Sequence, residues 1–157
     1  MRRRQPGAPP PGAYEAALGL LSRREYSRRD LTRKLARRGI DAAAAGDALE
    51  RLAGAAYQSD RRFAESLVRQ RVAQGYGPRH VQAELGTHGI PSDTIRELLD
   101  GPDWDAVARD LVARRLHAAP GPAARRRAAG LLQRRGFGSD TIRRVLGRLA
   151  TAGAGED

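Results

Sequence analysis

One apolar pattern occurs three times in this chain, and it constrains the fold more than any other feature. In each copy two apolar residues stand four apart, and four residues later comes a glycine followed by another apolar residue. The copies run from Leu31 to Ile40, from Val81 to Ile90 and from Ala128 to Phe137, so their glycines are 50 and 47 residues apart. Apolar residues four apart lie on one face of a helix, and glycine favours the left-handed turn that ends a helix. A repeat of this length is typical of an array of helical units that share one core.

A second apolar pattern follows each of these glycines at a constant offset. A further helical segment precedes each central helix, beginning with residues 13–24 in the first repeat. The sequence therefore predicts an all-α fold, a solenoid-like array of three tandem three-helix repeats that resemble helix-turn-helix motifs. The members of the second pattern are Ala45, Ala48 and Leu49, then Ile95, Leu98 and Leu99, and finally Ile142, Val145 and Leu146.

Glycine and proline clusters and helix-capping residues divide the chain into segments. Pro78 suits the first position of a helix, where its missing N–H leaves no bond unmade. Serine is a favoured N-cap, and the serines at positions 27, 59, 92 and 139 stand where helices are expected to begin. We expect a disordered basic arm over residues 1–12, three-helix repeats over residues 13–56, 57–100 and 101–150, and a flexible tail over residues 151–157.

Two tyrosines occupy the same place in the first and second repeats. Tyr26 and Tyr76 both stand immediately before the expected N-cap of the central helix. An apolar residue there packs on the fourth residue of the helix as a hydrophobic staple, which is Leu31 in one repeat and Val81 in the other. The third repeat has Ala123 at this place, so we expect a looser junction there.

The chain is basic, and its charges are unevenly distributed. The formal net charge is +11. Residues 14–56 carry nine basic and six acidic side chains, residues 57–100 carry six of each, and residues 101–149 carry eleven and four. This balance favours a polyanionic partner, nucleic acid before a membrane surface. A merely solvated surface is the alternative, because Lys34 is the single lysine and such an arginine excess can reflect coding composition.

Arginines are expected on the outer faces of the basic repeats. In the first central helix, the arginines at positions 29, 33 and 37 fall opposite the two inward leucines. The neutral second repeat has Ala83 and Thr87 where two of these arginines would stand. The helices carry few Asn or Gln side chains, which disfavours readout of base edges and leaves phosphate contacts open. The candidate contacts with a filament or nucleic acid are Arg29, Arg33, Arg37, Arg127, Arg134, Arg144 and Arg148.

The sequence disfavours several other chemistries. No cysteine occurs, which excludes disulfides, thiol nucleophiles and thiolate metal sites. The three histidines form no pair four residues apart, and the glycines around Tyr76 lack the strand and lysine of a phosphate-binding P-loop. No apolar stretch is long enough to span a bilayer, and none follows the basic start of the chain. We therefore expect a cytoplasmic protein with no membrane segment, catalytic residue, cofactor or metal.

Two stretches of the chain form recognisable motifs. The central one consists of Tyr57, Gln58, Ser59, Asp60, Arg61, Arg62, Phe63 and Ala64, followed by Arg69, Arg71, Gly75, Tyr76, Gly77, Pro78, Val81, Glu84 and Leu85. The earlier one consists of Arg24, Tyr26, Ser27, Asp30, Leu31, Lys34, Leu35 and Gly39. In order and separation they resemble the signatures of the RecX family, regulators of the bacterial recombinase RecA, and the resemblance covers about residues 14–149. Gln58 departs from it, because a hydrophobic residue or asparagine is more usual there.

The resemblance implies a curved, elongated body of three tandem three-helix repeats without catalytic activity or a cofactor. It implies binding to RecA, chiefly to its filament on single-stranded DNA, in the helical groove. It further implies inhibition of filament extension, ATP hydrolysis, strand exchange and coprotease activity. The motif residues are then structural, and they are Tyr26, Tyr57, Asp60, Phe63, Gly75, Tyr76, Gly77, Pro78, Gly39, Gly89 and Gly136.

Two other functions stay open. A stand-alone DNA-binding protein of the nucleoid type would bind DNA tightly and in a salt-sensitive way with no RecA present. A protein-interaction scaffold would use its arginines for solubility alone, and DNA would not affect it. We expect a monomer, with weak direct binding to DNA as a further property.

Overall fold

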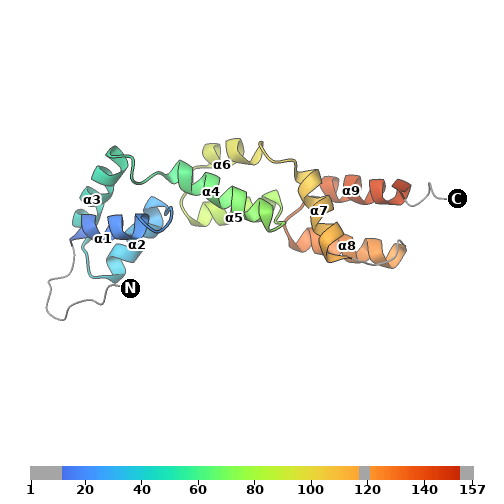
Figure 1. Ribbon diagram of the computed structural model, residues 1–157, viewed down its shortest axis with the longest axis horizontal. Helices are drawn as coiled ribbons and strands as arrows, with labels where there is room; N and C mark the ends of the chain where they lie inside the picture. Colours follow the sequence, from blue (N-terminus) through green and yellow to red (C-terminus); the bar gives the residue numbers. More distant parts are fainter. Residues whose placement is uncertain (1–11, 117–120, 153–157) are drawn as a thin grey trace. The chain divides into compact units, whose positions relative to one another are not determined.

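The computed structural model describes residues 12–116 and 121–152, with side chains through Arg148 in the last helix. These residues form nine α-helices and no strand, which confirms the all-α prediction. Figure 1 shows the helices in chain order. Their bounds are α1 Ala13–Leu21, α2 Arg28–Arg37, α3 Ala42–Gly54, α4 Asp60–Ala73, α5 Pro78–Thr87, α6 Ser92–Leu99, α7 Trp104–Arg115, α8 Pro122–Arg134 and α9 Ser139–Ala152.

Both expected terminal segments fall mainly outside the described residues. Of the basic arm expected over residues 1–12, only Gly12 is described, as the N-cap of α1. Of the tail expected over residues 151–157, the first two residues continue α9, and residues 153–157 lie outside the described part.

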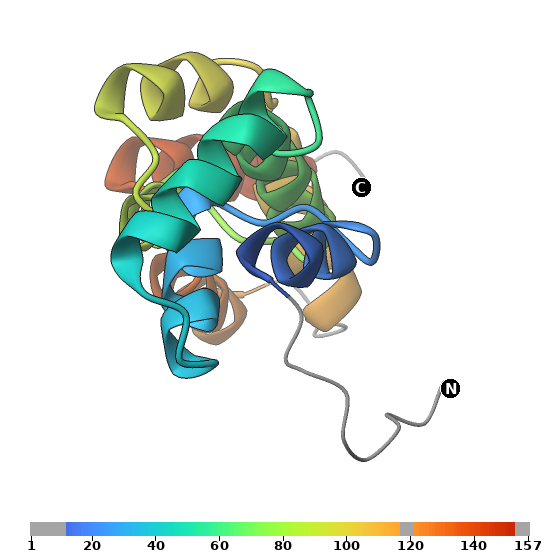
Figure 2. The same ribbon diagram turned by 90° about the vertical axis from the view of Figure 1, so that its left-hand side faces the viewer.

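The chain divides into two compact units, residues 1–63 and residues 64–157. In the N-terminal unit, α3 packs against both α1 and α2 (Figures 1 and 2). The core between these helices is aliphatic and small-residue rich, as the scarcity of aromatics in the sequence requires. Its buried members are Ala16, Ala17, Tyr26, Leu31, Leu35, Ala45, Leu49 and Leu52.

In the C-terminal unit, α7, α8 and α9 pack against one another, and α5 packs against α6. Leu132 and Val145 are completely buried in the core of the last three helices, and Phe137 is buried in the same core. In the second repeat, Val81, Leu85 and Ile95 are buried as their spacing predicts. The other two residues of the α6 pattern, Leu98 and Leu99, are only half-buried.

The glycine at the end of each central helix adopts the left-handed conformation that the repeat pattern predicts. The φ angles are 78° at Gly39, 76° at Gly89 and 90° at Gly136. In each case the apolar residue after the glycine donates its N–H to a carbonyl oxygen five residues earlier. The three helix ends are therefore built in the same way.

Two of the four expected serine caps are confirmed. Ser27 Oγ accepts a hydrogen bond from the Asp30 N–H, and Ser59 Oγ accepts one from the Arg62 N–H. The expectation was wrong at Ser92 and Ser139, which are the first residues of α6 and α9. These helices begin one residue earlier than expected, because Pro91 O and Gly138 O already accept the first helical hydrogen bonds.

The tyrosine before α2 is buried in the N-terminal core, with 8% of its surface exposed. The Lys34 ammonium and the Arg24 guanidinium lie over its ring, 5.4 Å and 4.8 Å from the centroid. In the third repeat Ala123 lies inside α8, because this helix starts at Pro122. At the place that corresponds to Tyr26, the third repeat therefore has a helical alanine and no tyrosine.

Candidate nucleic-acid interface

All seven predicted contact arginines have exposed side chains. On α2, Arg29, Arg33 and Arg37 lie on the face away from the two buried leucines. Neither Arg33 nor Arg37 pairs with an acidic side chain among the described residues. The first repeat therefore presents a basic face to solvent, as the sequence predicts.

The arginines predicted on α8 lie together. Arg127 and Arg134 line a cleft of about 350 Å³, whose remaining walls include Gly130 and Leu131. Two further arginines line the same cleft, Arg126 from α8 and Arg115 from the end of α7. Sequence reasoning missed this second pair, because the contribution of Arg115 depends on how α7 packs against α8.

Arg144 differs from the other predicted contacts, since it holds α9 to α7. Its Nε and Nη2 atoms donate to the two carboxylate oxygens of Asp105 at 2.9 Å and 3.0 Å. These hydrogen bonds lower the pKa of Asp105 and raise that of Arg144, against the opposing effect of burial. The charge of Arg144 is thus largely engaged within the protein. Arg148 is exposed one turn further along α9.

A larger arginine-lined cleft lies where the second and third repeats meet, and sequence reasoning did not find it. It has a volume of about 490 Å³, and its polar lining includes Gln74, Tyr76, Arg114, Arg115 and Arg135. One signal was present in the sequence, because no Asp or Glu occurs anywhere from Leu111 to Ser139. We call the six arginines that line the two clefts the arginine track: Arg114, Arg115, Arg126, Arg127, Arg134 and Arg135.

The two repeats meet through backbone at Gly77 and Gly136. The Gly77 N–H donates to Arg135 O at 2.7 Å, and the Arg79 N–H donates to Gly136 O at 3.0 Å. A Cβ atom at Gly77 would lie 2.5 Å from the carbonyl carbon of Gly136, so only glycine permits this approach. The carbonyls of the third repeat thus take the place of the side-chain cap that Ser27 supplies in the first repeat.

Tyr76 holds an arginine at this junction. The Arg135 guanidinium lies 4.6 Å from the centroid of the Tyr76 ring, and its Nη1 donates to Gln74 O at 3.0 Å. The same ring stacks on His80 with centroids 4.2 Å apart. Tyr76 is therefore half-buried against charged and polar groups, whereas Tyr26 is buried in an apolar core.

A charged pair next to this stack joins α4 to α5. Arg71 donates to both carboxylate oxygens of Glu84, at 2.7 Å and 2.6 Å. This hydrogen-bonded pairing holds the pKa of Glu84 below its usual value, although partial burial acts in the opposite direction. His80 Nε2 lies 3.4 Å from the same carboxylate, so the pair and the aromatic stack form one connected group.

The first part of the central motif stabilises the N-terminal unit. Asp60 Oδ1 accepts the Arg28 N–H at 2.8 Å and the Gln58 amide at 2.9 Å, so Asp60 caps α2 from a distant point in the chain. Phe63 is half-buried in the first turn of α4. Tyr57 was expected to be structural as well, but its side chain is 55% exposed. Its main chain closes the end of α3, where the Tyr57 N–H donates to Leu52 O.

Comparison with family models decides what kind of protein this is. Three models match in tandem: the first three-helix domain of RecX over residues 13–52, the second over residues 59–99 and the third over residues 103–146. The chain belongs to the RecX family.

Curated relatives agree with this assignment. A protein named regulatory protein RecX from Stenotrophomonas maltophilia (strain R551-3) is 53% identical over 149 residues, with 92% of this chain and 90% of the relative covered. Another of that name, from Xanthomonas campestris pv. campestris (strain B100), is 52% identical over 135 residues, with 82% of each chain covered.

Solved RecX structures share the fold. A crystal structure of RecX from Lactobacillus salivarius superposes with a TM-score of 0.77 at 23% identity, covering 88% of this chain and 95% of the other. A second crystal structure of regulatory protein RecX gives a TM-score of 0.73 at 23% identity, covering 85% and 70%.

Within the second RecX domain, the motif residues fall at both ends of α4. Asp60 lies at its start, whereas Gly75 follows its end at a φ of 81°. A Cβ atom at Gly75 would lie 2.9 Å from Leu111 on α7, so this glycine also permits close packing of the third RecX domain. Part of the motif in the second domain therefore serves close packing against the third domain.

The described residues bring no three His, Cys, Asp or Glu side chains together in an arrangement that could hold a metal ion. In the same part of the chain, none of the helices has the length and apolar character needed to cross a membrane.

Proposed function

We propose that this RecX family protein is a negative modulator of RecA. It binds the RecA filament on single-stranded DNA in the cytoplasm and inhibits filament extension, ATP hydrolysis, strand exchange and coprotease activity. It acts by binding, without a catalytic site or a cofactor of its own. Membership of the family supports this proposal, and the name of the curated relatives assigns them a regulatory role.

The observation that carries the proposal is the presence of exposed arginine faces on the first and third RecX domains. Arg33 and Arg37 in one, and Arg127 and Arg134 in the other, are exposed and have no acidic partner among the described residues. A nucleoprotein filament carries dense negative charge, and unpaired guanidinium groups are suited to it. Arg144 is better explained by its pairing with Asp105, so we leave it out of the proposed contacts. The six that remain are proposed because they are exposed, and they are Arg29, Arg33, Arg37, Arg127, Arg134 and Arg148.

Charge reversal tests these contacts. The double variant Arg37→Glu/Arg134→Glu should raise the concentration needed to inhibit the RecA ATPase on single-stranded DNA by about tenfold or more, because two attractive contacts become repulsive. The matched control is Arg96→Glu/Arg143→Glu, which reverses two exposed arginines that already pair with Asp93 and Asp140. Unchanged inhibition by the first variant would show that these arginines do not form the contact surface.

A stand-alone DNA-binding protein is the second candidate, favoured by the acid-free sequence around the arginine track. It predicts tight binding to bare DNA and no effect on RecA beyond competition for that DNA. An ATPase assay with RecA at two salt concentrations separates the two functions. Inhibition at sub-stoichiometric amounts, without matching affinity for bare DNA, supports modulation of RecA. Inhibition that appears only when the protein saturates the DNA supports the second candidate.

A further inference from the structure

Five helix ends in the described part of the chain are closed in the same way. At the ends of α2, α3, α4, α5 and α8, a residue in the left-handed conformation comes first. The N–H of the next residue then donates to a carbonyl oxygen five residues earlier. An apolar residue at this second place usually packs on the last turn of its own helix. The residues at this place are Ile40, Tyr57, Tyr76, Ile90 and Phe137.

Tyr57 differs from the other four residues in its exposure. Ile90 and Phe137 are buried, with 5% and 1% of their surfaces exposed. Ile40 and Tyr76 are half-buried. Tyr57 is 55% exposed, and among the described residues it is the only large apolar side chain that is exposed rather than buried or half-buried. The same turn directs its apolar residue inwards elsewhere, so the exposure of Tyr57 is a property of this place and not of the turn.

The main chain on both sides of Tyr57 is anchored. The next residue, Gln58, is buried, and its amide donates to Asp60 Oδ1 at 2.9 Å. On the other side, Arg62 Nη2 donates to the carbonyl oxygen of Ala56 at 2.8 Å. A tyrosine on a fixed main chain loses little conformational entropy when it binds a partner, because only two side-chain torsions are free to rotate.

The surface next to Tyr57 consists of small, uncharged residues. Residues 53–56 are Ala, Gly, Ala and Ala, and all four are exposed. No charged residue occurs from position 52 to position 59. We call residues 53–57 the tyrosine patch. Small side chains let the main chain of a partner approach the ring, and tyrosine is enriched among the side chains that contribute most to binding in protein interfaces.

The arginines that flank the patch in the chain are engaged within the protein. The Arg51 guanidinium lies 4.5 Å from the centroid of the Tyr14 ring, and Arg62 pairs with Glu25 at 3.0 Å. Arg61 also interacts within the protein. Nucleic acid is held chiefly by cations that meet its phosphates. A patch whose flanking cations are engaged therefore favours an apolar pocket on a protein over a phosphate backbone.

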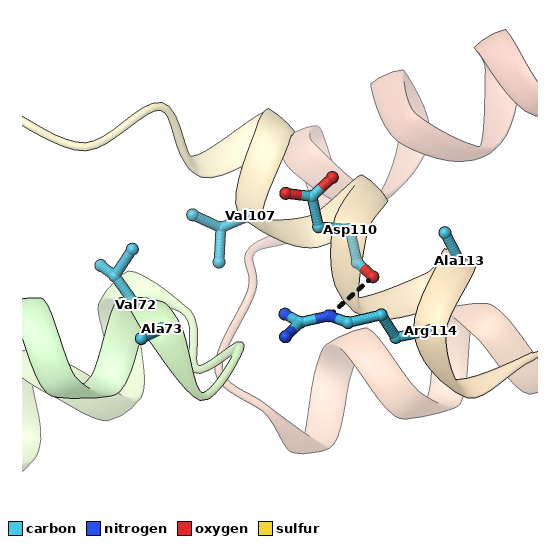
Figure 3. Close-up of a pocket in the computed structure, with 6 residues that line it drawn as sticks. All are labelled: Val72, Ala73, Val107, Asp110, Ala113 and Arg114. Atoms are coloured by element: carbon cyan, nitrogen blue, oxygen red, sulfur yellow. Dashed lines mark hydrogen bonds between the residues drawn. The ribbon is translucent and has the colours of Figure 1, made fainter.

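The hollows of the C-terminal unit offer no comparable apolar site. The cleft of about 540 Å³ in Figure 3 has Val72 and Val107 in its walls, but the charged side chains of Asp110 and Arg114 line it as well. An apolar group that entered this cleft would remove water from both charges, which costs free energy. The tyrosine patch contains no charged side chain, so an apolar partner can cover it without that cost.

We propose that the tyrosine patch binds an apolar pocket on a RecA subunit of the filament, with the Tyr57 ring filling that pocket. The inference rests on the proposed function and names the part of the filament that this patch contacts. The arginine faces then meet the negative charge of the filament, whereas the patch meets its protein. An anchor on the protein would allow inhibition without saturation of the DNA.

The concentration of the full chain needed to inhibit the RecA ATPase on single-stranded DNA tests the proposal. Tyr57→Ala should raise this concentration about tenfold or more, as the loss of a central aromatic side chain does in protein interfaces. Tyr57→Phe keeps the ring and should stay within about threefold of the wild type. Because the Tyr57 side chain is exposed, neither variant should change the unfolding temperature appreciably.

The matched control is Ile40→Ala, which truncates the residue at the same place in the turn after α2. Ile40 packs against the N-terminal core, so this variant should lower the unfolding temperature. Its inhibitory concentration, measured where the variant is folded, should stay within about twofold of the wild type. A loss of inhibition as large as that of Tyr57→Ala would overturn the proposal, because any weakening of this unit would then suffice.

Two further measurements separate the other partners that could cover the patch. Affinity for a fluorescein-labelled oligonucleotide of deoxythymidine, measured without RecA, should be the same for Tyr57→Ala and the wild type. An equal loss of affinity there would overturn the proposal by showing that the ring stacks on a base. Light scattering should also give the same mass for both proteins. A mass that falls in Tyr57→Ala would assign the patch to a second copy of this chain.

Failure of this inference and failure of the proposed function give different results. Unchanged inhibition by folded Tyr57→Ala, with full inhibition by the wild type, would overturn this inference alone. An absence of inhibition by the wild type would overturn the proposed function and this inference with it.

Discussion

The acidic neighbours of each arginine decide whether its charge is paired within the protein or open to a partner. Arg37 and Arg144 both lie on outward faces of amphipathic helices and look alike in the sequence. Arg144 finds Asp105 across a helix interface, whereas Arg37 has no acidic partner among the described residues. The helical period predicted correctly that both are exposed. It could not predict the pairing, because Asp105 is 39 residues away in the chain.

A strained alanine ends α3. Ala56, two residues after α3, has a φ of 61°, which is a left-handed conformation. At the other helix ends with a left-handed residue, that residue is glycine. We expect Ala56→Gly to stabilise the N-terminal unit by about 1 kcal/mol, since the steric cost at Cβ disappears. The reverse change at an equivalent turn, Gly39→Ala, should destabilise the same unit by about 1 kcal/mol. Thermal unfolding followed by circular dichroism measures both, and a lower unfolding temperature for Ala56→Gly would contradict the argument.

At the scale of the helices, the sequence predicted the elements well because their signals are local. The glycines at positions 39, 89 and 136 end α2, α5 and α8, and Pro78 begins α5. The segment from Gly75 to Pro78 links the end of α4 to the start of α5, as the division of the chain by glycine and proline predicts. The structure adds that Gly75 and Gly77 also allow the third repeat to approach closely. Sequence spacing could not show this, because Gly75 meets Leu111 and Gly77 meets Gly136, which are distant from them in the chain.

The pair between α4 and α5 predicts a pH-dependent stability. The Arg71 hydrogen bonds lower the pKa of Glu84 in the folded state, so the stabilisation is complete above the ordinary pKa of glutamate and disappears as the pH falls through the lowered value. We expect Glu84→Gln to destabilise the C-terminal unit by about 1–2 kcal/mol at pH 7, with the difference from the wild type narrowing below about pH 4.

Unfolding followed from pH 7 to pH 2 measures this difference. The control is Asp93→Asn, which breaks an exposed pair with Arg96 and should change stability by less than about 0.5 kcal/mol at any pH. A Glu84→Gln effect that stays constant down to pH 2 would mean that the carboxylate charge contributes nothing.

At the scale of the whole molecule, the repeats share a backbone plan and differ in surface charge. The neutral second RecX domain lies in the chain between two basic ones. The repeated apolar pattern gives all three domains the same three-helix fold. The residues between the apolar positions determine the surface charge that each domain presents to a partner. The RecX assignment covers all three domains, although the third lacks the staple tyrosine.

Because the first and third domains each carry an arginine face, we can predict how the effects of substitutions in the two faces on binding combine. If both touch one filament independently, the free-energy losses of Arg33→Gln/Arg37→Gln and Arg127→Gln/Arg134→Gln should add to within about 0.5 kcal/mol in the fourfold variant. The fold-increases in inhibitory concentration towards the RecA ATPase would then multiply. A fourfold variant no weaker than one of the double variants would show that a single face makes the contact.

The sequence by itself determined the all-α class, the three repeats, the helix ends at the three repeated glycines and the exposure of the seven predicted arginines. These properties depend on the helical period and on single residues such as Gly39 and Ser27, whose effects act within one turn. Only the tertiary structure decided that Arg144 is paired, that Gly77 meets Gly136, and that six arginines line adjoining clefts. The physical reason is that these contacts join distant residues, so they depend on how helices pack and on nothing that a local pattern contains.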